Sequence, residues 1–244
     1  MDVWTLDRSG VPTRFSFDHP RMPLWSPDGR AIALSTADGI AIRAVDSGRD
    51  DVIVRNVSQS SRPVAWTADG AWLIYEEWRP GTRRAIFIVP AAGGPSRALV
   101  QTPLSDDTEA QISPDQHWLA YVSNESGQNE VYVRRFPSGG VNEKWMVSQA
   151  GGIEPHWSHG TLLYLASDRA LMSVPYTSGV TFTPGEPVRL FQTRMSTLRV
   201  PAFTRNQYLV AADGRILINQ PPEAAPPPAV KVIVNWPSRL KNPH

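Results

Sequence analysis

The chain has 244 residues, with 24 Lys and Arg against 23 Asp and Glu, and no cysteine. This balanced charge gives no electrostatic basis for binding nucleic acid or an anionic membrane. The lack of cysteine excludes disulfides, thiol chemistry and cysteine-ligated metals. No apolar run approaches the ~20 residues that span a bilayer, so we expect no membrane insertion in this chain.

The first predicted elements are two short strands, residues 3–7 and 13–18, joined by a turn at Ser9-Gly10-Val11-Pro12. A sharper turn follows at Trp25-Ser26-Pro27-Asp28-Gly29, before an apolar strand over residues 30–35. Pro27 presets φ for the second turn position, and Asp28 can bond nearby backbone groups. Gly29 suits a left-handed conformation, so we expect a hairpin with positive φ at this glycine.

The same turn recurs along the chain. Its copies begin at Trp66, Ile112, Trp157 and Val210, and their spacings from Trp25 onward are 41, 46, 45 and 53 residues. Each copy is followed by an apolar strand, and Gly70 matches Gly29 in the second copy. A period of 40–50 residues with several short strands per unit is typical of β-propellers.

Each of the first four units contains two further predicted strands. The third strands are residues 40–45, 85–89, 130–134 and 170–174, and the fourth are 51–54, 97–100, 144–147 and 187–191. We therefore predict an all-β propeller of four-stranded antiparallel blades in one domain, residues 1–244. The blades are expected at 19–58, 59–104, 105–149, 150–193 and 194–244, after a partial blade at 1–18. The alternative is a β-sandwich, which does not repeat one turn sequence at one spacing.

These units resemble the WD-type repeats of TolB-like β-propellers, whose blades carry the Trp-Ser-Pro-Asp-Gly hairpin between the first and second strands. The last repeat, the proline-rich segment and Val232-Ile233-Val234-Asn235-Trp236 resemble the propellers fused behind bacterial serine/threonine kinases. A more distant resemblance is to the propeller of prolyl-oligopeptidase-type peptidases. The family resemblance implies a periplasmic or extracytoplasmic location. Trp25, Trp66 and Trp157 are expected to pack between blades.

The number of blades stays open at this stage. Residues 1–18 are interpreted as third and fourth strands of a blade, and residues 207–211, 215–220 and 230–236 as the first three strands of the last blade. Either the ring closes with five blades, or the chain is the C-terminal part of a larger propeller. The proline-rich residues 221–228 are interpreted as a stiff spacer, with a polyproline ligand as the alternative.

Catalytic motifs are not evident in the sequence. It contains no G-x-S-x-G nucleophile elbow, no phosphate-binding loop and no kinase motif. His156 and His159 are three residues apart and are expected on opposite faces, which disfavours shared metal ligation. Asp106 and Asp107 are expected to be solvated loop carboxylates. We therefore predict no enzyme activity, no cofactor and no metal site.

Four charged residues precede the recurring turns. Arg21 and Arg62 lie four residues before Trp25 and Trp66, while Glu109 and Glu154 lie three residues before Ile112 and Trp157. First strands line the central channel in the resembling family, so these four are expected at one mouth of the channel. Such a rim of both signs favours a peptide segment or protein loop over a polyanion.

The predicted function is therefore non-catalytic binding of a protein or peptide, in a sensory or interaction module of a larger bacterial protein. The alternatives are a propeller-type enzyme or gating domain, either glycosidase-like or peptidase-associated, and a structural remnant without its own activity.

Overall fold

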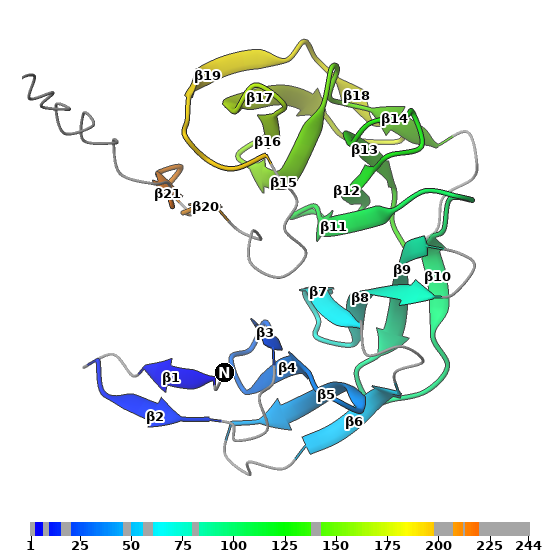
Figure 1. Ribbon diagram of the computed structural model, residues 1–244, viewed down its shortest axis with the longest axis vertical. Coiled ribbons are helices and arrows are strands. Elements are labelled where there is room, and N and C mark those ends of the chain that lie inside the picture. Colours follow the sequence, from blue (N-terminus) through cyan, green and yellow to red (C-terminus); the bar gives the residue numbers. More distant parts are fainter. Residues whose placement is uncertain are drawn as a thin grey trace, which may run out of the picture.

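The computed structural model describes residues 3–6, 10–15, 21–45, 50–55, 61–79, 83–137, 143–197, 207–211 and 213–219. Every regular element in these ranges is a β-strand (Figure 1). The predicted strand at residues 230–236 and the proline-rich residues 221–228 lie outside the described residues.

Four sheets, here called blades 1 to 4, follow one another along the chain, and their strands pair in sequence order. Blade 1 contains β3 (Arg21–Trp25), β4 (Ala31–Ser35), β5 (Gly39–Ala44) and β6 (Asp50–Arg55). Blade 2 contains β7 (Arg62–Trp66), β8 (Trp72–Arg79), β9 (Arg83–Pro90) and β10 (Arg97–Val100). Blade 3 contains β11 (Asp107–Ile112), β12 (Trp118–Ser123), β13 (Glu130–Arg135) and β14 (Lys144–Met146). Blade 4 begins with β15 (Gly152–Ser158), β16 (Thr161–Ala166) and β17 (Ala170–Thr177).

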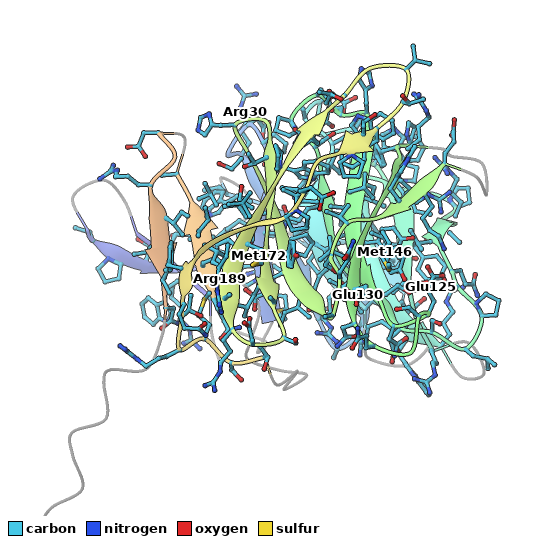
Figure 2. The ribbon with its side chains drawn as sticks, turned by 90° about the horizontal axis from the view of Figure 1, so that it is seen from above. Arg30, Glu125, Glu130, Met146, Met172 and Arg189 are labelled. Atoms are coloured by element: carbon cyan, nitrogen blue, oxygen red, sulfur yellow. The ribbon has the colours of Figure 1, made fainter. Side chains whose placement is uncertain are left out.

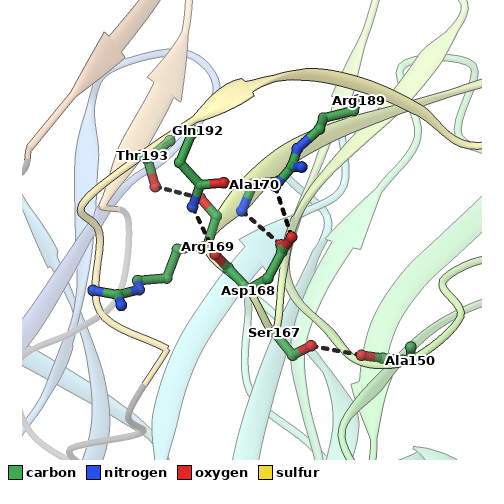
Figure 3. Close-up of polar contacts among 8 residues, drawn as sticks. All are labelled: Ala150, Ser167, Asp168, Arg169, Ala170, Arg189, Gln192 and Thr193. Atoms are coloured by element: carbon green, nitrogen blue, oxygen red, sulfur yellow. Dashed lines mark hydrogen bonds and ion pairs between the residues drawn. The ribbon is translucent and has the colours of Figure 1, made fainter.

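Blade 4 has a divided outer edge. Two separate strands, β18 (Thr183–Pro184) and β19 (Val188–Gln192), both pair with β17, whereas the sequence predicted one fourth strand at 187–191. Asp168, in the turn between β16 and β17, accepts hydrogen bonds from Ala170 N at 3.0 Å and from Arg189 at 2.7 Å (Figure 3). Gln192 also donates to the Asp168 carbonyl at 2.6 Å. These bonds attach β19 to the turn of its own sheet.

Two hairpins flank the four blades. β1 (Trp4–Leu6) pairs with β2 (Pro12–Arg14), and β20 (Tyr208–Val210) pairs with β21 (Ile216–Ile218). Each forms a two-stranded sheet of its own in the described structure.

The recurring turns use the chemistry that their residues predict. Ser26 Oγ donates to Asp28 Oδ1 at 2.6 Å, and the same carboxylate oxygen accepts Arg30 N at 3.0 Å. Gly29 and Gly70 have φ of 70° and 69°, as expected. In the third copy Gln116 takes the glycine position at φ 61°, and its side chain accepts Ala68 N from the turn of blade 2 at 2.9 Å.

The first strands of successive blades lie side by side in a row. β3 contacts β7, β7 contacts β11, β11 contacts β15, and β15 contacts β20, so that the sheets form an arc (Figure 1). Turned by 90°, the sheets are seen with side chains filling the spaces between them (Figure 2). The apolar cores lie at these interfaces: one joins blades 1 and 2, one joins blades 2 and 3, and the largest runs from blade 3 through blade 4 to Tyr208. Repeated four-stranded sheets packed face to face around an axis define a β-propeller, which confirms the predicted fold.

Candidate functional site

The first strand of each blade carries a β-bulge at the same place. The pairing shifts between Arg21 and Leu24 in blade 1, and at the corresponding points of β7, β11 and β15. The first bulge residues are Met22, Pro63, Glu109 and Glu154. Met22, Glu109 and Glu154 have positive φ, at 54°, 59° and 53°. Bulges of this kind redirect the side chain and backbone N–H of the bulged residue.

The glutamates at these bulges link neighbouring blades. Glu109 Oε2 accepts a hydrogen bond from Glu154 N at 2.7 Å, and Glu154 Oε2 accepts one from Gln207 N at 2.9 Å. Glu154 Oε1 also accepts the Gln207 amide at 2.8 Å. Each carboxylate therefore satisfies a backbone donor of the next first strand, and the series continues from blade 3 to β20.

Glu76 extends this series to blade 2, and the sequence analysis did not identify it. Glu76 Oε1, on β8, accepts Glu109 N at 2.6 Å, and the Glu76 residue is fully buried. Pro63 stands at the bulge of β7 and has no carboxylate to offer, so the adjacent strand supplies one. Proline also lacks a backbone N–H, so Pro63 has no donor that a side chain of blade 1 would have to accept. The bulge residue of blade 1 therefore need not be acidic, and it is Met22. The available sequence signal was a proline at a position that is acidic in the next two repeats.

The two predicted arginines do not hold the same position as the two glutamates. Arg21 pairs with Ser35 and Arg62 with Glu76, which is the register of Thr108 and Ile153 in blades 3 and 4. The arginines, four residues before their turns, therefore lie ahead of the bulge, whereas the glutamates, three residues before theirs, lie at the bulge. Arg62 is half-buried at the start of β7, and the Arg21 side chain lies outside the described part of the structure.

The environment of the glutamate series is largely dry. Glu154 is 5% exposed. Tyr208 donates its hydroxyl to the Glu154 carbonyl at 2.7 Å, and burial, assisted by the charges of Glu154 and Glu109, raises the pKa of Tyr208 well above 10. Glu109 accepts the backbone N–H of Glu154, and Glu154 accepts two donors from Gln207. This series of carboxylates is therefore built to join blades.

One further carboxylate differs from its expectation. Asp107 was expected to be solvated, but it begins β11, is fully buried, and accepts Thr102 N at 2.7 Å. Burial raises its pKa, because the charged form loses its hydration. Asp106, its neighbour, is partly exposed and pairs with Arg83 at 3.2 Å.

A cavity of about 430 Å³ lies between blades 2 and 3, beside the recurring turns. It is at the opposite end of β7 from Arg62. Its wall is mostly apolar, and one exposed cation, Arg97, stands at it. The residues around it are Thr67, Ala68, Asp69, Trp72, Ile88, Arg97, Gln116, Phe136 and Pro137.

The polar side chains around this cavity differ in how fully they are hydrogen-bonded within the protein. Asp69 and Gln116 are engaged in the turns, through Ala71 N and Ala68 N at 2.9 Å each. Arg97 reaches the Pro137 carbonyl only at 3.5 Å, which is long for a hydrogen bond. Arg97 therefore remains the group best placed to meet a bound anion.

Within the described ranges, no group of three or more His, Cys, Asp or Glu residues is placed to hold a metal ion. None of the described segments forms a helix long and apolar enough to cross a membrane. His156 packs edge-on against the Tyr208 ring with centroids 4.6 Å apart, and burial lowers its pKa to about 4.

These features define a β-propeller whose blades are joined by the buried carboxylates of Glu76 and Glu154 and the half-buried carboxylate of Glu109. No family model matches the chain. Solved structures similar to it include TolB from Acinetobacter baumannii, with a TM-score of 0.59 and 15% identity over 79% of this chain and 49% of TolB. A puromycin-hydrolysing peptidase of Mycobacterium tuberculosis matches with a TM-score of 0.65 and 17% identity, over 86% of this chain and 38% of the peptidase. A chain in a nidogen/laminin complex matches with a TM-score of 0.55 and 15% identity, over 69% of this chain and 65% of the matched chain.

The chain thus spans about half the length of TolB and a smaller share of the peptidase. At these identities the likeness shows the fold alone, a β-propeller similar to those of TolB and the peptidase.

Proposed function

We propose that this propeller is a non-catalytic module that binds a protein or peptide segment. The observation that carries the proposal is the cavity between blades 2 and 3, which combines an apolar wall with the weakly engaged guanidinium of Arg97. Binding sites commonly combine an apolar concavity with a few polar groups that fix orientation. An apolar side chain next to a carboxylate, as in a peptide, would satisfy both parts of this cavity.

The glutamate series supports a binding role over catalysis. General acid–base chemistry needs two titrating groups driven toward different pKa values. Glu109 and Glu154 instead accept backbone donors of the next strand, as structural acceptors do. One similar structure is a complex between nidogen and laminin, so this fold occurs in protein–protein assemblies.

The rim of Arg21, Arg62, Glu109 and Glu154 is a second candidate surface for the same function. We propose that the arginines contact the partner there, while the glutamates keep the first strands in place. The module would belong to a larger bacterial sensory protein, and the sequence resemblance implies a kinase-linked parent.

An alternative is a propeller that gates a peptidase, which the likeness to the mycobacterial peptidase favours. The chain contains no nucleophile elbow, so any hydrolytic centre of such an enzyme would lie on other residues. Propeller folds serve both roles, and only the site distinguishes them.

The test is selection of binders from a random peptide library on the immobilised chain, followed by calorimetric titration of the selected peptides. Arg97→Glu is expected to weaken binding at least tenfold, whereas the exposed Arg215→Glu, a matched charge reversal, leaves it unchanged. Arg21→Ala with Arg62→Ala tests the rim in parallel. Equal affinity for all variants would refute both surfaces, and hydrolysis of the peptide by the wild type would refute the non-catalytic assignment.

A further inference from the structure

Trp25 differs from the tryptophans at equivalent positions. Trp66 donates its indole N–H to the Leu24 carbonyl of blade 1 at 3.4 Å, and Trp157 donates to the Gln111 carbonyl of blade 3 at 3.1 Å. In both cases the acceptor is the residue just before the recurring turn of the preceding blade, which begins at Trp25 in blade 1 and at Ile112 in blade 3. Trp25, on β3, is 50% exposed. In blades 2 and 4, the first strand of the preceding blade covers the equivalent tryptophan. The side of β3 that holds Trp25 therefore has the form of an inter-blade interface.

The β1–β2 hairpin already occupies the outer part of that preceding position. Arg134, on the third strand of blade 3, donates to the Leu99 carbonyl at the outer strand of blade 2, at 2.7 Å. Arg43 holds the same register in blade 1, because Arg43 pairs with Ile32 as Arg134 pairs with Leu119. Arg43 donates to the Phe15 carbonyl at 2.5 Å, directly after β2. Phe15 thus corresponds to Leu99, which makes β2 a fourth strand and β1 a third strand.

The β20–β21 hairpin holds the complementary positions. Gln207 and Tyr208 bind Glu154 of β15, as a first strand should. Val210 begins the fifth copy of the turn and pairs with Ile216, as Ile112 begins the third copy and pairs with Leu119, although the fifth turn is one residue shorter. β20 is therefore a first strand and β21 a second strand. Leu209 and Leu217, on this hairpin, are 51% and 70% exposed.

We propose that these two hairpins are the inner and outer halves of one blade. In this closed form β21 pairs with β1, and the sheet runs β20, β21, β1, β2. β20 then lies against β3, and the Leu209 carbonyl, one residue before Val210, accepts the indole N–H of Trp25. The arc of Figure 1, whose two end hairpins lie on the same side, becomes a ring of five blades. This inference is independent of the proposed binding function.

The repeat alignment also fixes the register of the new strand pair. In blade 2, Glu76 pairs with Ile86, next to the position of Leu99. Val3 takes the place of Ile86, because Phe15 N bonds the Val3 carbonyl at 2.9 Å. Asn219 takes the place of Glu76. Antiparallel pairing then puts Leu217 opposite Thr5 and Ile218 opposite Trp4.

Because the chain has no cysteine, paired cysteines give a clean test. Two full-length double variants, Thr5→Cys with Leu217→Cys and Trp4→Cys with Ile218→Cys, cover both pair types of an antiparallel ladder. The control, Thr13→Cys with Leu217→Cys, moves one thiol outward to β2, about 4.8 Å farther. The variants are oxidised with copper phenanthroline and resolved on non-reducing gels. Hydroxyl-radical footprinting then compares Trp25 in the oxidised and reduced forms.

The closed form predicts an intramolecular disulfide in at least one predicted pair, forming at least tenfold faster than in the control. It also predicts that, once the disulfide has formed, hydroxyl radicals modify Trp25 as slowly as they modify Trp157. Disulfides found only between two chains would overturn the proposal and assign the completing strands to a second copy. Equal rates in the predicted pairs and the control would overturn it as well.

Discussion

Glu109 and Glu154 stand at the same position of neighbouring blades, and the carboxylate of the first accepts the backbone N–H of the second at 2.7 Å. Both residues have positive φ, which aims the N–H of one blade at the side chain of the blade before it. The bond fixes the spacing of two first strands without using any outer strand. It explains how sheets with separate hydrogen-bond ladders can form one propeller.

Removing this acceptor should destabilise the protein. Glu109→Ala removes the carboxylate that accepts the partly buried Glu154 N–H, and we expect a loss of about 1–3 kcal/mol in the free energy of unfolding. Glu109→Gln keeps an oxygen acceptor and should lose less. Urea denaturation followed by circular dichroism measures both. Glu186→Ala, at an exposed loop glutamate, is the control and should change stability by less than about 0.5 kcal/mol. Equal effects at Glu109 and Glu186 would show that the clamp contributes nothing.

Substitution at the turn glycines tests backbone strain separately from packing. A Cβ at Gly29 would meet nothing within 4 Å, and one at Gly70 would meet only Pro27 Cδ at 3.9 Å. The cost of Gly29→Val or Gly70→Val should therefore come from the positive φ alone, at about 1–3 kcal/mol. Gly179 is equally open but has no positive φ, so Gly179→Val is a matched control. Thermal melts in which all three variants match would contradict the turn geometry.

The sequence predicted the repeating part of this fold well, because its turns are local. Pro27, Asp28 and Gly29 determine their hairpin through residues two or three positions apart. The inter-blade contacts were less predictable, since they depend on a bulge that shifts the register by one residue. Arg62 therefore pairs ahead of the bulge in its strand, whereas Glu109 lies at the bulge of the next first strand. Glu76 could not be identified without knowing that Pro63 occupies the bulge beside it.

The indole clamp at Trp157 provides another stability test. Trp157→Phe keeps a large ring against the neighbouring core but removes the N–H that binds the Gln111 carbonyl at 3.1 Å. We expect a loss of about 1–2 kcal/mol, combining the hydrogen bond with the smaller ring. The same change at Trp78, which is 42% exposed, should have a smaller effect in urea denaturation. A loss at Trp78 as large as that at Trp157 would contradict the clamp.

His156 should make the stability of the protein depend on pH. Burial against the Tyr208 ring lowers its pKa from 6.5 to about 4. Between these values the unfolded chain binds a proton that the folded chain does not bind, so acid favours unfolding. The contribution is fully present above pH 6.5, is lost as the pH falls toward 4, and changes no further below 4. The expected loss is on the order of 1–3 kcal/mol.

Other groups titrate in the same range, so the test is a difference between two proteins. His156→Phe keeps a ring beside Tyr208 and removes the titrating nitrogen. Denaturation midpoints measured at intervals from pH 7.5 to pH 4 should fall more steeply for the wild type than for this variant, with the separation developing between pH 6.5 and 4. His117→Phe, at an exposed turn residue, is the control and should follow the wild-type curve. Parallel curves for the wild type and His156→Phe would mean that His156 takes up its proton in the folded protein as readily as in the unfolded chain, and that the contact with Tyr208 does not exclude water.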